Sequence, residues 1–126
     1  MTDPQELRVD VLGNAAEGFV VVVAGDVDLA SAPVLHDRLH PLAARGAGVA
    51  VDLAGVTFID SSGIHALLTS ARAIDAAGGS LVLAAPSPAV RRLFELVKVD
   101  EVVPVEADRD AAIARSRDAA AQHGEA

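Results

Sequence analysis

The sequence predicts a single α/β domain whose mixed, mostly parallel sheet has four or five strands, with about four helices. Short β-branched runs alternate with segments in which apolar residues recur at helical spacing. The first two strand-like runs follow each other without a helix between them. The chain has 126 residues and is 52% hydrophobic, which is enough for one core. Since strands that alternate with helices pair in parallel, whereas two successive strands form a hairpin, the expected order is β-β-α-β-α-β-α-β-α.

The strands are expected where apolar residues are contiguous or alternate with polar ones. Residues 7–11 alternate, which predicts a strand with one exposed face. Residues 19–24 form a continuous valine-rich run, which is typical of a strand covered on both faces. Pro104 places the last strand at a sheet edge because it cannot donate to a neighbour. The three later strands are expected at residues 49–53, 81–84 and 101–105.

The four helical segments each begin at a residue type that caps helix N-termini well. These residues are Ser31, Ser61 or Ser62, Ser87 and Asp108. Pro41 should end or kink the first helix. Ile113 is the only large apolar residue of the last helix, so we expect that helix to pack weakly and to fray after about Ala120. The predicted domain therefore spans residues 1–120, and residues 121–126 are expected to be a disordered tail.

Composition and charge exclude several classes of protein. The net charge of −8 and the single lysine argue against a nucleic-acid binder. The absence of cysteine excludes disulfides, thiolate metal sites and a cysteine nucleophile. The longest apolar run, residues 19–24, is too short to span a membrane, and the first twenty residues lack the pattern of a signal peptide. We expect a soluble, cytoplasmic monomer or weak dimer that binds neither nucleic acid nor membrane.

The most informative segment is Asp60-Ser61-Ser62-Gly63, which follows a strand and opens a helix. This position lies at the carboxyl end of the sheet, where open α/β sheets place their sites. A serine at a helix N-terminus faces free backbone N–H groups, which tolerate a phosphoryl group. The alternative interpretation is structural: the two serines serve only as caps, and Gly63 permits a tight turn.

Four segments together resemble the bacterial STAS-domain anti-sigma factor antagonists. They are Gly-Asp-Val-Asp at residues 25–28, Val-Asp-Leu at 51–53, Thr-Phe-Ile-Asp-Ser-Ser-Gly at 57–63, and Ser-Pro-Ala-Val-Arg-Arg-Leu-Phe at 87–94. The resemblance extends over residues 7–114 and implies a single STAS domain. It also implies a regulator that works by partner switching and is not itself an enzyme.

In the resembled family, the unphosphorylated protein binds an anti-sigma factor that is also a serine kinase, and this binding releases a sigma factor. The kinase uses Mg-ATP to phosphorylate the serine directly after the aspartate, which here is Ser61. A metal-dependent serine/threonine phosphatase reverses the modification. The resemblance implies no cofactor for this chain. The residues expected to form or support the partner surface around Ser61 are Asp26, Asp28, Ser31, Asp60, Ser62, Gly63 and His65.

His65 departs from the family pattern, in which a small residue often occupies this position. On a helix, His65, Thr69 and Arg72 share a face opposite the apolar stripe. That face either contacts the kinase and selects it, or is an ordinary solvated face. Both interpretations stay open from the sequence.

Three other functions are alternatives to a phosphorylation switch. A STAS scaffold that does not switch, within a larger signalling or lipid-transport assembly, would use Ser61 only as a cap. His36 and His40 have the i, i+4 spacing of a zinc-binding helix, but no third ligand is evident, so we expect no metal site. Asp60, Ser62 and His65 resemble a hydrolase set, but the Gly-x-Ser-x-Gly element is absent.

Overall fold

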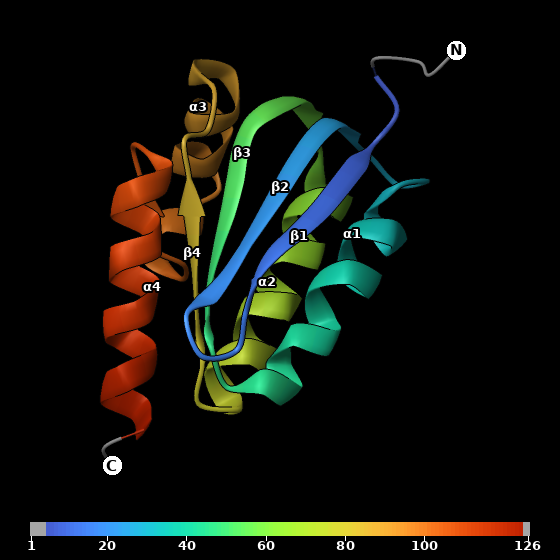
Figure 1. The fold of residues 1–126 in the computed structure, drawn as a ribbon. Coiled ribbons are helices and arrows are strands. Elements are labelled where there is room, and N and C mark those ends of the chain that lie inside the picture. The colour runs from blue at the N-terminus through green and yellow to red at the C-terminus, as the bar shows by residue number, and fades with distance from the viewer. Residues whose placement is uncertain (1–4, 125–126) are drawn as a thin grey trace.

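The computed structural model describes residues 5–124 and has a five-stranded sheet in the order β1-β2-β3-β4-β5. Helices α1 and α2 pack on one face of the sheet, and α4 packs on the other (Figure 1). The strands are β1 Arg8–Asn14, β2 Gly18–Val27, β3 Gly48–Ile59, β4 Ser80–Ala84 and β5 Val105–Glu106. The α-helices are α1 Ala32–Leu39, α2 Ser61–Ala76, α3 Pro88–Leu96 and α4 Arg109–Gly124. Two short 3-10 helices are η1 His40–Arg45 and η2 Val99–Glu101.

The topology confirms the predicted order. Strands β1 and β2 form an antiparallel hairpin, and the pairs β2–β3, β3–β4 and β4–β5 are parallel. The main core lies between the sheet and the α1–α2 layer. The parallel strands therefore direct their carboxyl ends, and the loops that follow them, to one edge of the sheet.

Strand β2 differs from the prediction, because it is not covered on both faces. Val21 and Val23 are fully buried under α1 and α2, but Val20 and Val22 are only half-buried. The reason is the position of α4, which packs mainly on β3 and β4 and covers little of β2. The continuous run of β-branched residues therefore predicted more burial than strand β2 has.

The bounds of all five strands differ from those predicted, and β3 and β5 differ most. Strand β3 continues beyond residue 53 to Ile59 and pairs with β2 through two register shifts. The prediction of a strand at residues 101–105 was wrong, because η2 occupies the start of that segment and β5 comprises only Val105 and Glu106. Its place at the sheet edge is confirmed. Helix α1 ends at Leu39, directly before the 3-10 segment that contains Pro41, also as predicted.

The last helix packs closely, which the sequence did not predict. Ala112 is fully buried against the sheet. The backbone of Ser116 passes so near Gly48 that a Cβ there would lie 2.6 Å from the Ser116 carbonyl carbon and oxygen. Arg109 Nη2 lies 2.7 Å from the Asp52 carboxylate, which is 10% exposed. Small residues and an ion pair thus replace large apolar side chains as the means of docking.

Helix α4 also extends further than predicted. It continues to Gly124, past the expected end near Ala120, so the expected tail begins inside a helix. Residues 125–126 lie outside the described residues. Within residues 5–124, no helix is both long and apolar enough to cross a membrane.

Candidate functional site

The turn between β3 and α2 places the two candidate serines at the start of the helix. Asp60 is extended and its Oδ1 accepts hydrogen bonds from the N–H of Ser62 at 2.9 Å and of Gly63 at 3.3 Å. Asp60 is therefore the N-cap, and neither serine hydroxyl caps the helix. Of the two predicted starts of α2, Ser61 and Ser62, the structure has Ser61 as the first helical residue. The interpretation of the serines as caps is wrong, because the aspartate before them makes these bonds.

Ser61 is exposed, and its hydroxyl makes no hydrogen bond within the described part of the chain. Ser62 is half-buried. A hydroxyl that holds no structural bond can be modified without loss of the local fold. This property distinguishes Ser61 from a serine that stabilises its own turn.

Gly63 is required for close packing beneath this turn. A Cβ at this position would lie 2.6 Å from Val27 Cγ1 and 2.7 Å from Ile59 Cγ1. The residue is buried, so it supports the surface from below and does not line it. Its contacts fix the first turn of α2 against the ends of β2 and β3.

The β2–α1 turn is closed by hydrogen bonds between Asp28 and Ser31. The Ser31 N–H donates to Asp28 Oδ1 at 3.0 Å, and the Asp28 N–H donates to Ser31 Oγ at 2.9 Å. Ser31 Oγ also lies 3.0 Å from both Asp28 Oδ1 and the Asp26 carbonyl oxygen, either of which can accept its proton. The backbone and side-chain hydrogen bonds of Ser31 hold the pKa of Asp28 below its ordinary value.

Ser31 therefore does not cap α1 as expected. It stands at the N-cap position, but its side chain makes no bond to the helix, since it turns back toward Asp28 and Asp26. Asp26 in turn accepts a 2.6 Å hydrogen bond from Thr57 Oγ1, which ties the end of β2 to β3. Sequence reasoning assigned no role to Thr57, although Thr57 stands within the same motif as Ser61.

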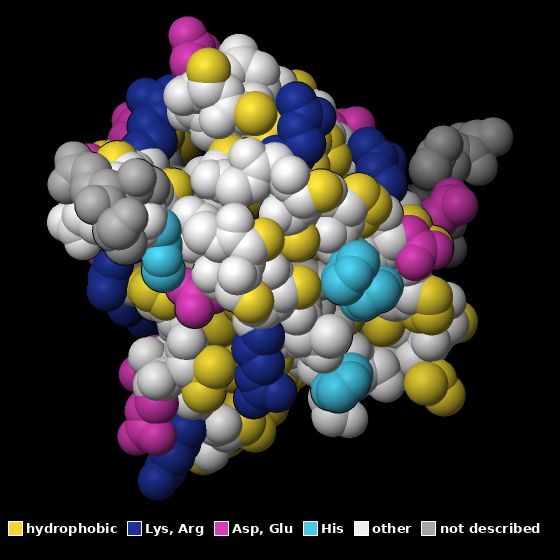
Figure 2. Space-filling model, turned by 90° about the horizontal axis from the view of Figure 1, so that it is seen from below, with side chains coloured by type: hydrophobic (Ala, Val, Ile, Leu, Met, Phe, Trp, Pro, Cys, Tyr) yellow, Lys and Arg dark blue, Asp and Glu magenta, His cyan; other side chains and the backbone are white. Residues whose placement is uncertain are grey.

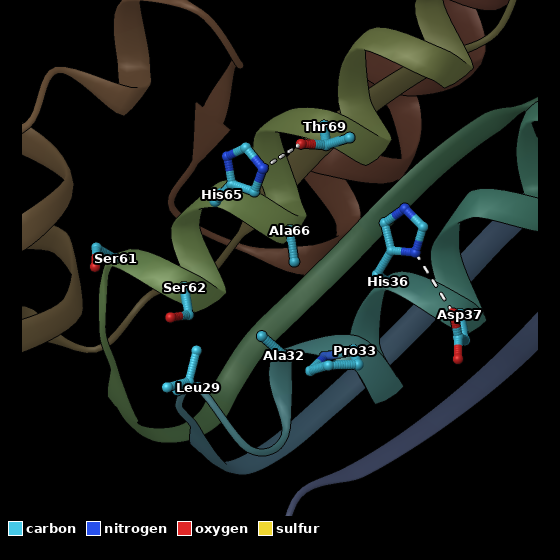
Figure 3. Close-up of a pocket in the computed structure, with 10 residues that line it drawn as sticks. All are labelled: Leu29, Ala32, Pro33, His36, Asp37, Ser61, Ser62, His65, Ala66 and Thr69. Atoms are coloured by element: carbon cyan, nitrogen blue, oxygen red, sulfur yellow. Dashed lines mark hydrogen bonds and ion pairs between the residues drawn. The ribbon is translucent and has the colours of Figure 1, made fainter.

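Two hollows flank the β2–α1 turn on its opposite sides. The first, here called the α1–α2 groove, has a volume of about 590 Å³ (Figure 3). Its lining residues are Leu29, Ala32, Pro33, His36, Asp37, Ser61, Ser62, His65, Ala66 and Thr69. The second, here called the acidic hollow, has a volume of about 540 Å³. Its lining residues are Gln5, Glu6, Leu7, Asp26, Asp28, Ala30, Ser31 and Val34.

The predicted site residues are thus divided between two hollows. Ser61, Ser62 and His65 line the α1–α2 groove, whereas Asp26, Asp28 and Ser31 line the acidic hollow. Asp60 and Gly63 line neither, because they build the turn beneath. Thr69, which the sequence analysis placed on the same helix face as His65, also lines the groove. Sequence reasoning assigned no partner role to the other groove residues, of which the exposed Leu29 directly follows the Gly-Asp-Val-Asp segment.

The histidines show no arrangement of a metal centre or a hydrolase. The rings of His36 and His40 stack at a centroid distance of 4.9 Å. Among residues 5–124, no group of three or more His, Cys, Asp or Glu side chains is placed to hold a metal ion. His65 Nε2 lies 3.4 Å from Thr69 Oγ1, and the Asp60 carboxylate is bonded to backbone N–H groups. Neither side chain is bonded to a serine hydroxyl, as a catalytic triad requires.

Comparison with known proteins gives the family. The STAS-domain family model matches residues 7–112. The anti-sigma-B factor antagonist of Bacillus subtilis is 32% identical over 107 residues, which cover 85% of this chain and 97% of that protein.

Solved structures share the fold. An anti-sigma factor antagonist from Mycobacterium paratuberculosis superposes with a TM-score of 0.78 at 24% identity, covering 92% of this chain and 98% of that one. The Bacillus cell fate determinant SpoIIAA, solved in its phosphorylated form, has a TM-score of 0.65 at 22% identity, covering 87% of this chain and 100% of that one. On the family match and the relative from Bacillus subtilis, this chain belongs to the STAS-domain family.

Proposed function

We propose that this chain is an anti-sigma factor antagonist, and that phosphorylation of Ser61 switches its partner binding off. The observation that carries the proposal is the exposed, unbonded hydroxyl of Ser61, placed directly after a capping aspartate at the start of α2. The named relative from Bacillus subtilis supports the regulatory class. On this proposal the chain is a kinase substrate and has no catalytic activity of its own.

The switch follows from the charge that a phosphoryl group adds. A phosphoserine carries about −1.5 to −2 charges at pH 7. Asp60 Oδ1 already occupies the N–H groups of Ser62 and Gly63, so a phosphate on Ser61 does not gain those donors unless it displaces the cap. The added charge then stays on the surface beside the Asp60 carboxylate. A loss of about 3 to 4 kcal/mol in partner binding would lower affinity by two to three orders of magnitude.

The proposed partners are an anti-sigma factor with serine kinase activity and a serine/threonine phosphatase that removes the phosphoryl group. We place the protein in the cytoplasm, where these partners act, as a monomer or weak dimer. On the face shown in Figure 2, Lys and Arg side chains are dispersed among acidic, histidine and hydrophobic ones. This face therefore has no continuous basic surface of the kind that nucleic-acid binding needs.

Intact-mass spectrometry tests the proposal directly. The purified protein is incubated with ATP and each candidate anti-sigma factor kinase from its own source. We expect one phosphoryl group on the wild type, none on Ser61→Ala, and one on the matched control Ser62→Ala. Modification that persists in Ser61→Ala would show that the switch residue lies elsewhere.

The scaffold alternative makes a different prediction from the same variants. A STAS module that does not switch would bind its partner equally well with Ser61→Ala and Ser61→Asp. The switch predicts that Ser61→Ala binds like the wild type and that Ser61→Asp binds weakly. Equal binding by both variants would support the scaffold and contradict the proposal.

A further inference from the structure

The α1–α2 groove exists because two facing helix positions carry alanine. Ala32 on α1 and Ala66 on α2 are both buried and form part of its lining. Pro33 continues the apolar surface at the start of α1. Larger side chains at the alanine positions would fill this space, so the helices leave an apolar depression that the chain itself does not occupy.

Leu29 stands at the mouth of the groove. The residue is 78% exposed, and in Figure 3 its side chain extends from the β2–α1 turn toward Ser62. Ser61 lies at the outer end of the groove with its side chain turned away from α1 (Figure 3). The apolar depression is therefore continuous with the proposed phosphorylation site.

The acidic hollow lies across the same turn from the groove. Leu29 lines the groove, and the next residues, Ala30 and Ser31, line the acidic hollow. Three carboxylates line that hollow, from Glu6, Asp26 and Asp28, and no Lys or Arg is among its lining residues. This surface is complementary to a cationic side chain.

We propose that one segment of the anti-sigma factor crosses the β2–α1 turn, placing an apolar side chain in the α1–α2 groove and a Lys or Arg side chain over the acidic hollow. This proposal rests on the proposed function, because it names how the same partner binds beside Ser61. Burial of an apolar anchor in a preformed depression supplies affinity, and the carboxylates supply orientation and association rate. A phosphate on Ser61 would stand at the rim of the groove and oppose this docking.

The groove is tested by binding titrations with the kinase that phosphorylates Ser61, measured without ATP. We expect Leu29→Ala to weaken binding about tenfold or more, as truncation of an interface anchor does. The matched control is Leu96→Ala, because Leu96 is 71% exposed at the end of α3, outside both hollows. Its affinity should stay within about twofold of the wild type. A second variant, Thr69→Phe, places a ring at the groove wall and should also weaken binding.

The acidic hollow is tested by removing a charge that the β2–α1 turn does not need. Glu6→Gln should weaken binding and reduce its dependence on salt, because it removes one carboxylate facing the cation. The matched control is Glu17→Gln, at an exposed position in the β1–β2 turn. This variant should change neither the affinity nor its dependence on salt. A photo-reactive benzoylphenylalanine at position 29 should crosslink to an apolar residue of the kinase that has Lys or Arg nearby in its sequence.

The outcomes separate this inference from the proposed function. If Leu29→Ala and Thr69→Phe bind like Leu96→Ala while Ser61→Asp still loses binding, the groove proposal is wrong and the switch stands. If no candidate kinase binds the wild type, or Ser61→Asp binds as the wild type does, the proposed function fails and the groove proposal fails with it.

Discussion

The two turns that carry the candidate site use aspartate and serine in opposite ways. In the β2–α1 turn, Asp28 and Ser31 bond to each other and close the loop. In the β3–α2 turn, Asp60 bonds to backbone N–H groups and leaves the Ser61 hydroxyl without a partner in the described chain. The same residue types thus give one serine a structural role and leave the other free.

This difference shows how a modifiable serine can stand at a helix start without weakening it. Since Asp60 caps α2, the helix does not depend on Ser61, and a kinase can change that side chain without removing a cap. Ser31 offers no such freedom, because its hydroxyl is engaged with Asp28 and with the Asp26 carbonyl.

The largest expected effect comes from the glycine beneath the β3–α2 turn. Gly63→Val should lower the free energy of unfolding by about 3 kcal/mol, because its side chain would be forced into Val27 and Ile59. Urea unfolding measures the change. Arg72→Val, at an exposed position of the same helix, is the control for the β-branched substitution and should change stability far less. A Gly63→Val protein as stable as this control would contradict the packing described here.

The cap comes next. Asp60→Ala should cost about 0.5–2 kcal/mol of stability, since two N–H groups of the first turn lose their acceptor. Ser61→Ala should change stability by less than about 0.5 kcal/mol, because its hydroxyl makes no bond within residues 5–124. Urea unfolding of both variants measures these losses of stability. A larger loss for Ser61→Ala than for Asp60→Ala would show that Ser61 caps the helix.

Loss of the Ser31 hydroxyl should have a similar or smaller effect. Ser31→Ala should cost about 1 kcal/mol, the typical contribution of a hydrogen bond. The comparison with Ser61→Ala is direct, because both variants remove one hydroxyl from a turn at the same edge of the sheet. If both variants had the same stability, the distinction between the two turns would be lost.

The smallest effect is the acid titration of Asp28. Its pKa lies below the ordinary 3.8, because the Ser31 N–H and hydroxyl stabilise the carboxylate. The bonds therefore stabilise the folded protein above the ordinary pKa, and this contribution is lost as pH falls below 3.8 through the lower pKa of the folded state. Carboxyl NMR should show the Asp28 pKa rising toward its ordinary value in Ser31→Ala. An unchanged pKa would show that these bonds do not cause the shift.

Much of the fold was predictable because local patterns and topology agreed. The alternation of β-branched runs with helical periods, and the two successive strands at the start, led to the observed order. The close docking of α4 was not predictable, because it depends on Gly48, Ala112 and the Asp52–Arg109 pair, which are far apart in sequence. Small residues do not produce the hydrophobic periodicity from which a packing face is predicted.

The candidate site was predictable only in part for the same reason. The sequence located Ser61 at a helix start, but it could not tell that Asp60 would take the cap. It grouped Asp26 and Asp28 with Ser61, whereas the β2–α1 turn separates their hollow from the groove. The groove depends on small residues of two helices that are far apart in sequence, so no short motif predicts it.

The most direct test of the switch compares the affinity of one partner for two forms of the same protein. The kinase is titrated, without ATP, with unphosphorylated protein and with protein phosphorylated on Ser61 alone, at fixed salt. We expect phosphorylation to weaken binding by about two to three orders of magnitude, equivalent to about 3 to 4 kcal/mol. Equal affinity for the two forms would show that Ser61 is not a switch and is only a surface residue of a scaffold.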